Sequence, residues 1–208
     1  MKLFSKIFIL LISVTLLRLA VGCCNCENEF YSFNYNSVLI HNIDNSGQWS
    51  KPSEKNEMAA ASVAFEIQIV GSEVVQSASK KKININGFKT LSAQTCNCDD
   101  QYTPNQTISE IHIRTLYDLN SNYCCNEEVT SLFLANTCID CADIGSFYIT
   151  IDELQKRINP EVLYHTAVNK FLVYLKEPVE NNKAQFEVEI VFSDGQSIIA
   201  QTALITII

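Results

Sequence analysis

The chain has 208 residues, of which 47% are hydrophobic and 10% aromatic, and its formal net charge is −8. This length suits a single domain, and the apolar content is too high for a disordered chain. The acidic balance argues against nucleic-acid binding, because affinity for phosphate backbones comes mainly from Lys and Arg. The basic cluster Lys80-Lys81-Lys82 is interpreted as a solvated loop or a charged sheet edge.

The N-terminus has the order of a bacterial secretory signal. Lys2 and Lys6 precede an apolar run over residues 7–17, and the small residues Ala20 and Gly22 follow it. The run is shorter than the roughly 20 apolar residues that a transmembrane helix needs. We therefore predict that residues 1–22 are a signal peptide and that the chain is exported.

Cys23 is the predicted lipidation site. Ala20-Val21-Gly22-Cys23 is similar to the motif at which bacterial lipoproteins are cleaved and acylated, although its spacing also suits ordinary signal-peptide cleavage. The chain has nine Cys, so acylation of Cys23 leaves eight that can pair completely. We expect residues 23–29 to be a Cys-rich tether that anchors the protein by lipid in the bacterial outer membrane or at the cell surface.

The first half of the globular region contains three predicted strands. Residues 30–43 and 63–70 are rich in β-type residues, and a turn signal at residues 44–47 follows the first. Residues 95–107 form a predicted polar loop. Residues 108–116 then alternate polar and apolar, which places His112 and Arg114 on one face of the third strand.

The second half adds one helix and further strands. Thr150 and Glu153 have the spacing of a capping box, which predicts a short helix over residues 152–158. Strands are predicted over residues 170–175, 185–192 and 197–208, with a hairpin turn at Asp194-Gly195. The pattern predicts a mainly β fold: an antiparallel β-sandwich of immunoglobulin-like character with one short helix, forming a single domain over residues 30–208.

Eight cysteines form four local pairs: Cys24 and Cys26, Cys96 and Cys98, Cys124 and Cys125, and Cys138 and Cys141. In an oxidising compartment such thiols form disulfides, and this is the favoured interpretation. Adjacent Cys124 and Cys125 suit a mutual disulfide poorly, so separate partners are expected for them. The alternative is a zinc or copper site, because thiolates at these spacings can chelate either metal.

No catalytic signature accompanies His41, His112 or His165, and we expect no enzymatic activity and no cofactor. The aromatic residues Phe30, Tyr31, Phe33 and Tyr35 could stack on a sugar, but alternation on one strand face is more typical of a core. The expected function is binding of a protein or glycan partner at the loops of a rigid scaffold.

The tether, residues 40–47, residues 115–123 and the Asp194-Gly195 hairpin together resemble a group of uncharacterised Bacteroidetes lipoproteins that share a domain of unknown function. The resemblance implies an envelope location and assigns no activity and no functional residue.

Overall fold

The computed structural model describes residues 29–47, 51–53, 56–76, 100–136, 148–159, 163–164 and 167–208. This part of the chain contains one α-helix, α2 (Ile151–Ile158), and a short 3₁₀-helix, η1 (Thr130–Leu132). It also contains fourteen strands: β1 (Phe30–Asp44), β2 (Lys51–Pro52), β3 (Glu57–Met58), β4 (Val63–Gln76), β5 (Gln101–Pro104), β6 (Ile108–Thr115), β7 (Phe133–Asn136), β8 (Ile149–Thr150), β9 (Leu163–Tyr164), β10 (Val168–Leu175), β11 (Lys183–Ala184), β12 (Phe186–Phe192), β13 (Ser197–Gln201) and β14 (Ile205–Ile207).

The largest sheet has eight strands, in the order β8-β7-β10-β4-β1-β5-β9, with β2 paired to β1. Its centre is the long antiparallel pair of β1 and β4, in which Ile40 lies opposite Ile67. Along β4, Phe65, Ile67 and Ile69 are buried, while the residues between them lie on the other face. This alternation follows from the two-residue period of a strand and gives the sheet one core face.

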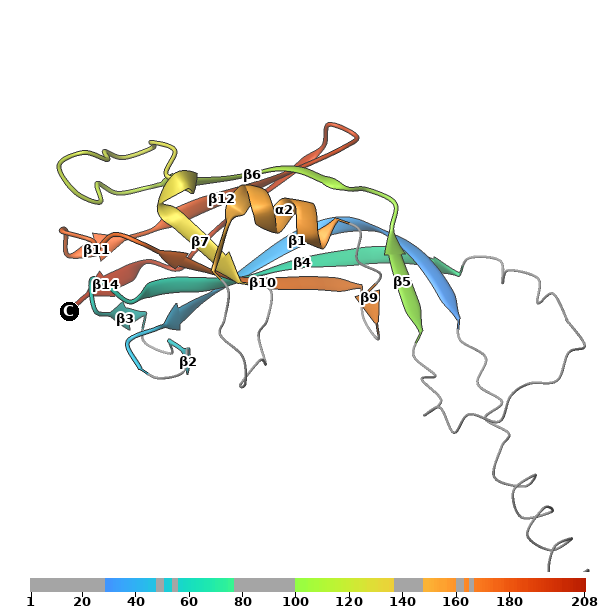
Figure 1. Cartoon of the computed structure of the whole chain (residues 1–208), viewed down its shortest axis with the longest axis horizontal. Helices are drawn as coiled ribbons and strands as arrows, with labels where there is room; N and C mark the ends of the chain where they lie inside the picture. The colour runs from blue at the N-terminus through green and yellow to red at the C-terminus, as the bar shows by residue number, and fades with distance from the viewer. Residues whose placement is uncertain are drawn as a thin grey trace, which may run out of the picture.

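A second layer of two three-stranded sheets covers this core face. Their strand orders are β13-β12-β6 and β11-β14-β3. In Figure 1, β6 and β12 run above the layer that contains β1, β4 and β10. Rings from both layers meet in the core: the Phe65 and Phe186 centroids are 5.7 Å apart, and Phe133 contacts both rings. The prediction of a mainly β fold with antiparallel sheets packed against each other is confirmed.

Helix α2 begins where the sequence predicts a capping box. Glu153 N–H donates to Thr150 Oγ1 (3.2 Å), and Thr150 N–H donates to Glu153 Oε2 (3.1 Å). The helix buries one face, formed by Ile151, Leu154 and Ile158, against the core. Since α2 also contacts β6, β7 and β8, it lies at the edge of β6.

The C-terminal region differs from the predicted single strand over residues 197–208. It divides into β13 and β14, and β14 pairs with β11 and β3 in another sheet. Thr202 lies at the break: its N–H donates to Phe186 O, and its Oγ1 accepts from Phe186 N–H (3.0 Å). These two bonds end the β12–β13 ladder, so the chain can enter the next sheet.

The predicted polar loop over residues 95–107 also differs from the structure. Residues Gln101–Pro104 form β5, which pairs in parallel with the beginning of β1. The segment becomes a strand because β1 supplies its backbone hydrogen-bonding partner. Its own short polar sequence shows no strand pattern. The predicted signal peptide, residues 23–28 of the predicted tether and residues 77–99 lie outside the described residues. Within the described residues, no helix is long and apolar enough to cross a membrane.

Candidate functional site

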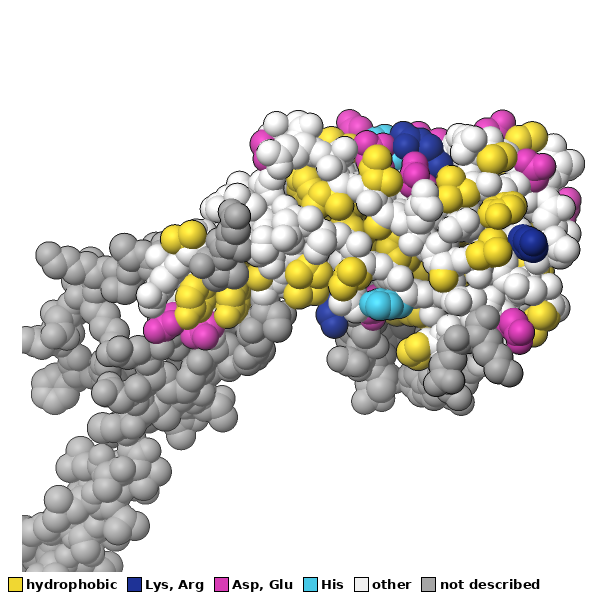
Figure 2. Space-filling model, turned by 180° about the vertical axis from the view of Figure 1, so that it is seen from behind, with side chains coloured by type: hydrophobic (Ala, Val, Ile, Leu, Met, Phe, Trp, Pro, Cys, Tyr) yellow, Lys and Arg dark blue, Asp and Glu magenta, His cyan; other side chains and the backbone are white. Residues whose placement is uncertain are grey.

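Polar side chains gather on the outer face of strand β6. Glu110, His112 and Arg114 alternate with the buried Ile111 and Ile113, so the three polar residues share one face. Figure 2 shows acidic, basic and histidine side chains along the upper edge of the molecule, the side on which Figure 1 draws β6 and β12. The prediction that His112 and Arg114 lie on the same face of this strand is confirmed.

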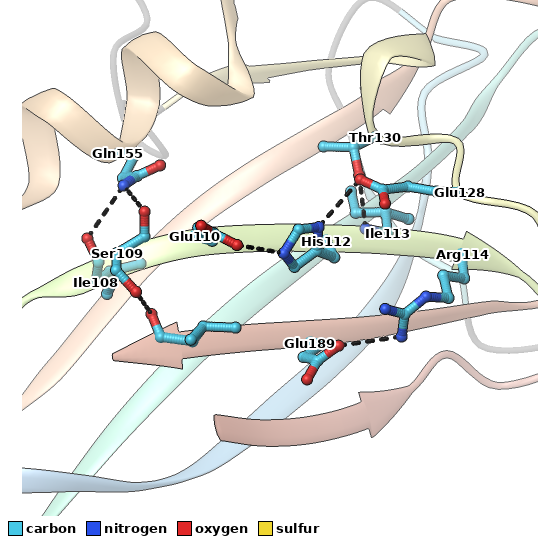
Figure 3. Close-up of polar contacts among 11 residues, drawn as sticks. Ile108, Ser109, Glu110, His112, Ile113, Arg114, Glu128, Thr130, Gln155 and Glu189 are labelled. Atoms are coloured by element: carbon cyan, nitrogen blue, oxygen red, sulfur yellow. Dashed lines mark hydrogen bonds and ion pairs between the residues drawn. The ribbon is translucent and has the colours of Figure 1, made fainter. Parts of the chain in front are cut away.

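His112 lies between two carboxylates, as Figure 3 shows. Its Nε2 is 2.8 Å from Glu110 Oε2, and its Nδ1 is 3.0 Å from Glu128 Oε1. Glu110 lies on the same strand, whereas Glu128 comes from the segment that precedes η1. The exposed fraction is 26% for the His112 side chain and more than half for Glu110 and Glu128. The two carboxylates are therefore open to a ligand, while the ring between them is half-buried.

The charges of this cluster depend on one another. The pKa of His112 is raised above 6.5, chiefly by its hydrogen bond to Glu128 and then by that to Glu110, with burial acting in the opposite direction. The same bond to His112 is the main reason that the pKa of Glu128 is lowered. An imidazolium ring between two carboxylates can donate from both nitrogens, and the cluster then carries one net negative charge.

Thr130 holds Glu128 at this edge. Thr130 Oγ1 donates to Glu128 Oε1 (3.1 Å) and accepts from the Ile113 N–H (2.8 Å). The main chain of Glu128 also pairs with Arg114 in an isolated β-bridge. The position of the Glu128 carboxylate relative to His112 is therefore fixed by both its side chain and its backbone.

Arg114 is paired to a neighbouring strand rather than to the His112 cluster. Its Nη1 lies 3.1 Å from Glu189 Oε2 and 3.7 Å from Glu187 Oε1, both on β12. The register places Glu189 opposite His112 and Glu187 opposite Arg114. The ion pairs of Arg114 are therefore with Glu187 and Glu189, while its charge also helps to lower the pKa of the nearby Glu128 carboxyl.

A groove of about 700 Å³ runs between β6 and α2. The residues that line it are Glu110, Ile111, His112, Glu128, Thr130, Ser131, Phe133, Thr150, Ile151, Asp152 and Gln155. The described lining residues include three carboxylates and neither Lys nor Arg. Ile111, Phe133 and Ile151 are buried core residues and supply an apolar floor beneath the acidic rim.

Helix α2 is tied to β6 at one end of the groove. Gln155 Nε2 donates to Ser109 O and to Ile108 O (3.3 Å), as Figure 3 shows. Asn159 Nδ2 donates to Ile108 O and its Oδ1 accepts from Ile108 N–H, each at 2.7 Å. Both walls of the groove are therefore held at a fixed spacing before any ligand enters.

The predicted cysteine sites are only partly described. Cys124 and Cys125 are exposed, and their thiols are free. Cys125 N–H donates to Asp118 Oδ1 (2.7 Å), and Cys124 N–H to Glu127 Oε2 (3.1 Å), so both lie in a loop held by its own hydrogen bonds. The expected disulfides of these two residues are not seen. Cys23, Cys24, Cys26, Cys96, Cys98, Cys138 and Cys141 lie outside the described residues, so their lipidation, disulfides or metal binding stay predictions.

The other candidate residues do not converge on a site. His41 is exposed on β1, with Glu66 opposite it in register, and His165 lies outside the described residues. In the described part of the chain, no group of three or more His, Cys, Asp and Glu side chains is arranged to hold a metal ion. The zinc or copper alternative therefore gains no support from these residues.

The aromatic residues at the beginning of β1 divide between core and surface. Phe33 and Tyr35 are buried, as expected for a core face. Tyr31 is half-buried and stacks on Tyr102 of β5 with ring centroids 5.0 Å apart. Tyr31 donates to Glu29, and this bond is the main reason that its pKa is raised to about 12.

The residues that matter most to the groove were missed by sequence reasoning. Glu110 could have been found, because it lies two residues before His112 on an alternating strand. Glu128, Thr130 and Gln155 carry no sequence signal that connects them to His112, since they reach β6 only through the folded chain.

Together the fold and the site define a mainly β domain with one helix and an acidic groove at the edge of its second layer. The chain belongs to the family described as Domain of unknown function (DUF5034), whose model matches residues 34–203. This range includes β6, α2 and every residue that lines the groove. No curated protein matches the sequence. The match confirms the resemblance as far as it concerns an uncharacterised domain family.

Proposed function

We propose that this protein is a lipoprotein of the bacterial cell envelope. We also propose that its domain binds a positively charged partner protein in the groove between β6 and α2, and that it does so without catalysing a reaction. The observation that carries the binding role is the unbalanced charge of the groove. Glu110, Glu128 and Asp152 line it, and among its described lining residues only His112 can become cationic, by protonation.

The position of the carboxylates supports a cationic partner. Glu110 and Glu128 are more than half exposed, so a Lys or Arg side chain can reach them without displacing a buried group. When it is protonated, His112 offsets one of these two negative charges. Charge complementarity of this kind steers association and selects against acidic competitors.

The arrangement of His112 supports binding rather than catalysis. Both ring nitrogens are within hydrogen-bond distance of a carboxylate. A general base needs a ring nitrogen that can reach the proton of a substrate. Here each nitrogen is already directed to a glutamate, and Thr130 directs its hydroxyl hydrogen to Glu128 as well.

Binding can be tested with an acetylated five-residue peptide in which alanine alternates with lysine, and with a control peptide in which glutamate replaces lysine. We expect calorimetry to detect binding of the lysine peptide alone, with an affinity that falls as salt screens the charges. The double variant Glu110→Gln, Glu128→Gln should weaken binding about fivefold or more, because each lost pair with a partly exposed charge costs up to about 1 kcal/mol.

Glu187→Gln is the matched control for the single variant Glu110→Gln. Each removes one carboxylate from the sheet that contains β6, but Glu187 does not line the groove. Equal weakening by Glu187→Gln and by Glu110→Gln would mean that only the overall charge matters, and a binding site in the groove would then be wrong.

The envelope location has a separate test. The intact mass of the protein from its native membrane should equal residues 23–208 plus acyl chains. A mass that includes residues 1–22, or one without acyl chains, would contradict the lipid anchor.

A further inference from the structure

The hydrogen bonds of β6 show which of its backbone groups face the groove. Thr115 N–H donates to Glu127 O, and Asn126 N–H donates to Thr115 O. Ile113 O accepts from Val129 N–H, so Ile113 and Thr115 both direct their N–H and C=O away from β12. In an antiparallel ladder this direction alternates from residue to residue. Ile111, two residues before Ile113, therefore directs its N–H and C=O away from β12 as well.

The free edge of β6 is interrupted on both sides of Ile111. On one side, Ser109 O accepts from Gln155 of α2. On the other, Ile113 N–H is taken by Thr130 Oγ1. Among the described residues, no group outside the β6–β12 ladder bonds to the Ile111 N–H or C=O. Ile111 lines the groove, so one donor and one acceptor of the main chain are available there.

We propose that the groove binds an extended peptide segment of the partner, which adds to the edge of β6 opposite Ile111 in an antiparallel orientation. In that orientation a single peptide residue exchanges both hydrogen bonds with Ile111. The opening is one residue wide, so the peptide gains two main-chain bonds, and its side chains must supply the rest of the affinity.

The pleat of the strand determines which side chains the peptide needs. Residues opposite each other on neighbouring strands share a face. The peptide residue paired with Ile111 therefore points toward the apolar floor near Phe133 and Ile151 and must be small or apolar. Its two neighbours lie on the face of Glu110 and His112, where basic side chains meet Glu110 and Glu128. The partner motif is thus basic–apolar–basic in an extended segment.

This inference rests on the proposed binding of a cationic partner, and one peptide series separates the two. The parent peptide has the order Ala-Lys-Ala-Lys-Ala. Methylation of the main-chain nitrogen of its central Ala removes the hydrogen that would bond to Ile111 O. We expect this change to weaken binding to the full chain at least tenfold. The main-chain nitrogen of each Lys faces away from β6. Methylation of that nitrogen should therefore have a much smaller effect on binding.

The protein provides a second measurement. Binding of the parent peptide should slow hydrogen exchange at the Ile111 amide about tenfold or more, because that N–H becomes bonded. If methylated and parent peptides bind equally and Ile111 exchange is unchanged, while Glu110→Gln with Glu128→Gln still weakens binding, the strand addition is wrong and the cationic groove stands. If the parent peptide does not bind, both proposals fail.

An alternative occupant of the groove is the basic run Lys80-Lys81-Lys82 of this chain. A variant with Lys80, Lys81 and Lys82 changed to Ser should bind the parent peptide as the unchanged protein does. Tighter binding by this variant would show that the run competes for the groove, and it would overturn the assignment to a separate partner.

Discussion

The ring of Phe33 occupies the space into which a side chain at Gly71 would project. A Cβ built on Gly71 would overlap three atoms of that ring. Phe33 is fully buried between the layers, and Gly71 N–H donates to Ala167 O at the edge of β10. The absence of a side chain at residue 71 is therefore what lets β1 and β4 close over the aromatic core.

Gly71→Ala should destabilise the protein by about 2–3 kcal/mol, because overpacking forces a buried ring from its position. Chemical denaturation measures this loss directly. Gly195→Ala is the control: no atom lies near its added Cβ, but its φ is +82°, so a loss of about 1 kcal/mol from backbone strain alone is expected. A smaller loss at Gly71 than at Gly195 would mean that the Phe33 ring moves aside at little cost.

The stabilisation by the His112 cluster should depend on pH within a definite window. The folded pKa of His112 is raised, so its contribution is complete below about 6.5 and is lost as the pH rises through the folded value. The folded pKa of Glu128 is lowered from 4.5, so its contribution is complete above that value and is lost as the pH falls. Both contributions are present between about pH 4.5 and 6.5.

We therefore expect the difference in Tm between the protein and His112→Gln to be largest in that window and to shrink above neutral pH. The difference in unfolding free energy should stay below about 1 kcal/mol, because all three side chains are partly exposed. A difference that grows toward alkaline pH would contradict the assigned direction of the shift.

The two glutamates should not affect the His112 ring equally. The bond to Glu128 is the larger cause of its raised pKa. Glu128→Gln should therefore lower the pKa of His112, followed by NMR of the ring protons, more than Glu110→Gln does. The reverse order would show that Glu110 is the principal partner in solution.

Loss of the helix cap should affect both stability and binding. Thr150→Ala removes the acceptor of the Glu153 N–H and should cost about 1 kcal/mol in thermal unfolding. Because α2 forms one wall of the groove, affinity for the lysine peptide should also fall. Thr150→Ser keeps the hydroxyl and should retain both the stability and the affinity for the peptide. If the Ser variant lost as much stability and affinity as the Ala variant, the cap would be excluded as the cause.

The thiols of Cys124 and Cys125 should react with iodoacetamide before any reduction, because both are exposed and free. Mass spectrometry of the peptide that contains them measures the number of added groups. Two groups without reductant are expected. If the thiols were modified only after reduction, the disulfides that the cysteine pattern predicts would be present, and the assignment of free thiols would be wrong.

Local signals in the sequence were sufficient for the longer elements: β1, β4, β6, β10, β12 and helix α2. The alternation over residues 108–116 predicted β6, and the spacing of Thr150 and Glu153 predicted α2 within one residue. The Asp194-Gly195 turn was predicted because Gly adopts the positive φ that a tight hairpin requires. Each of these features depends on contacts between residues close in the chain.

The failures involve partners distant in the chain. Pattern alone did not predict β5, because its ladder comes from β1, about seventy residues earlier. It also did not divide the C-terminal strand at Thr202, where the bonds to Phe186 end one sheet. The alternation of apolar residues predicts which face of a strand is buried. It does not predict which other strand will pair with that strand.

The sequence by itself determined that this chain is an acidic, mainly β protein with one capped helix and with His112 on an outward strand face. Only the tertiary structure decided that Glu128 and α2 meet that face and that a groove opens beside Ile111. The physical reason is that period, caps and turns are properties of neighbouring residues. The charge and the free backbone groups of a groove depend instead on which distant segments the core brings together.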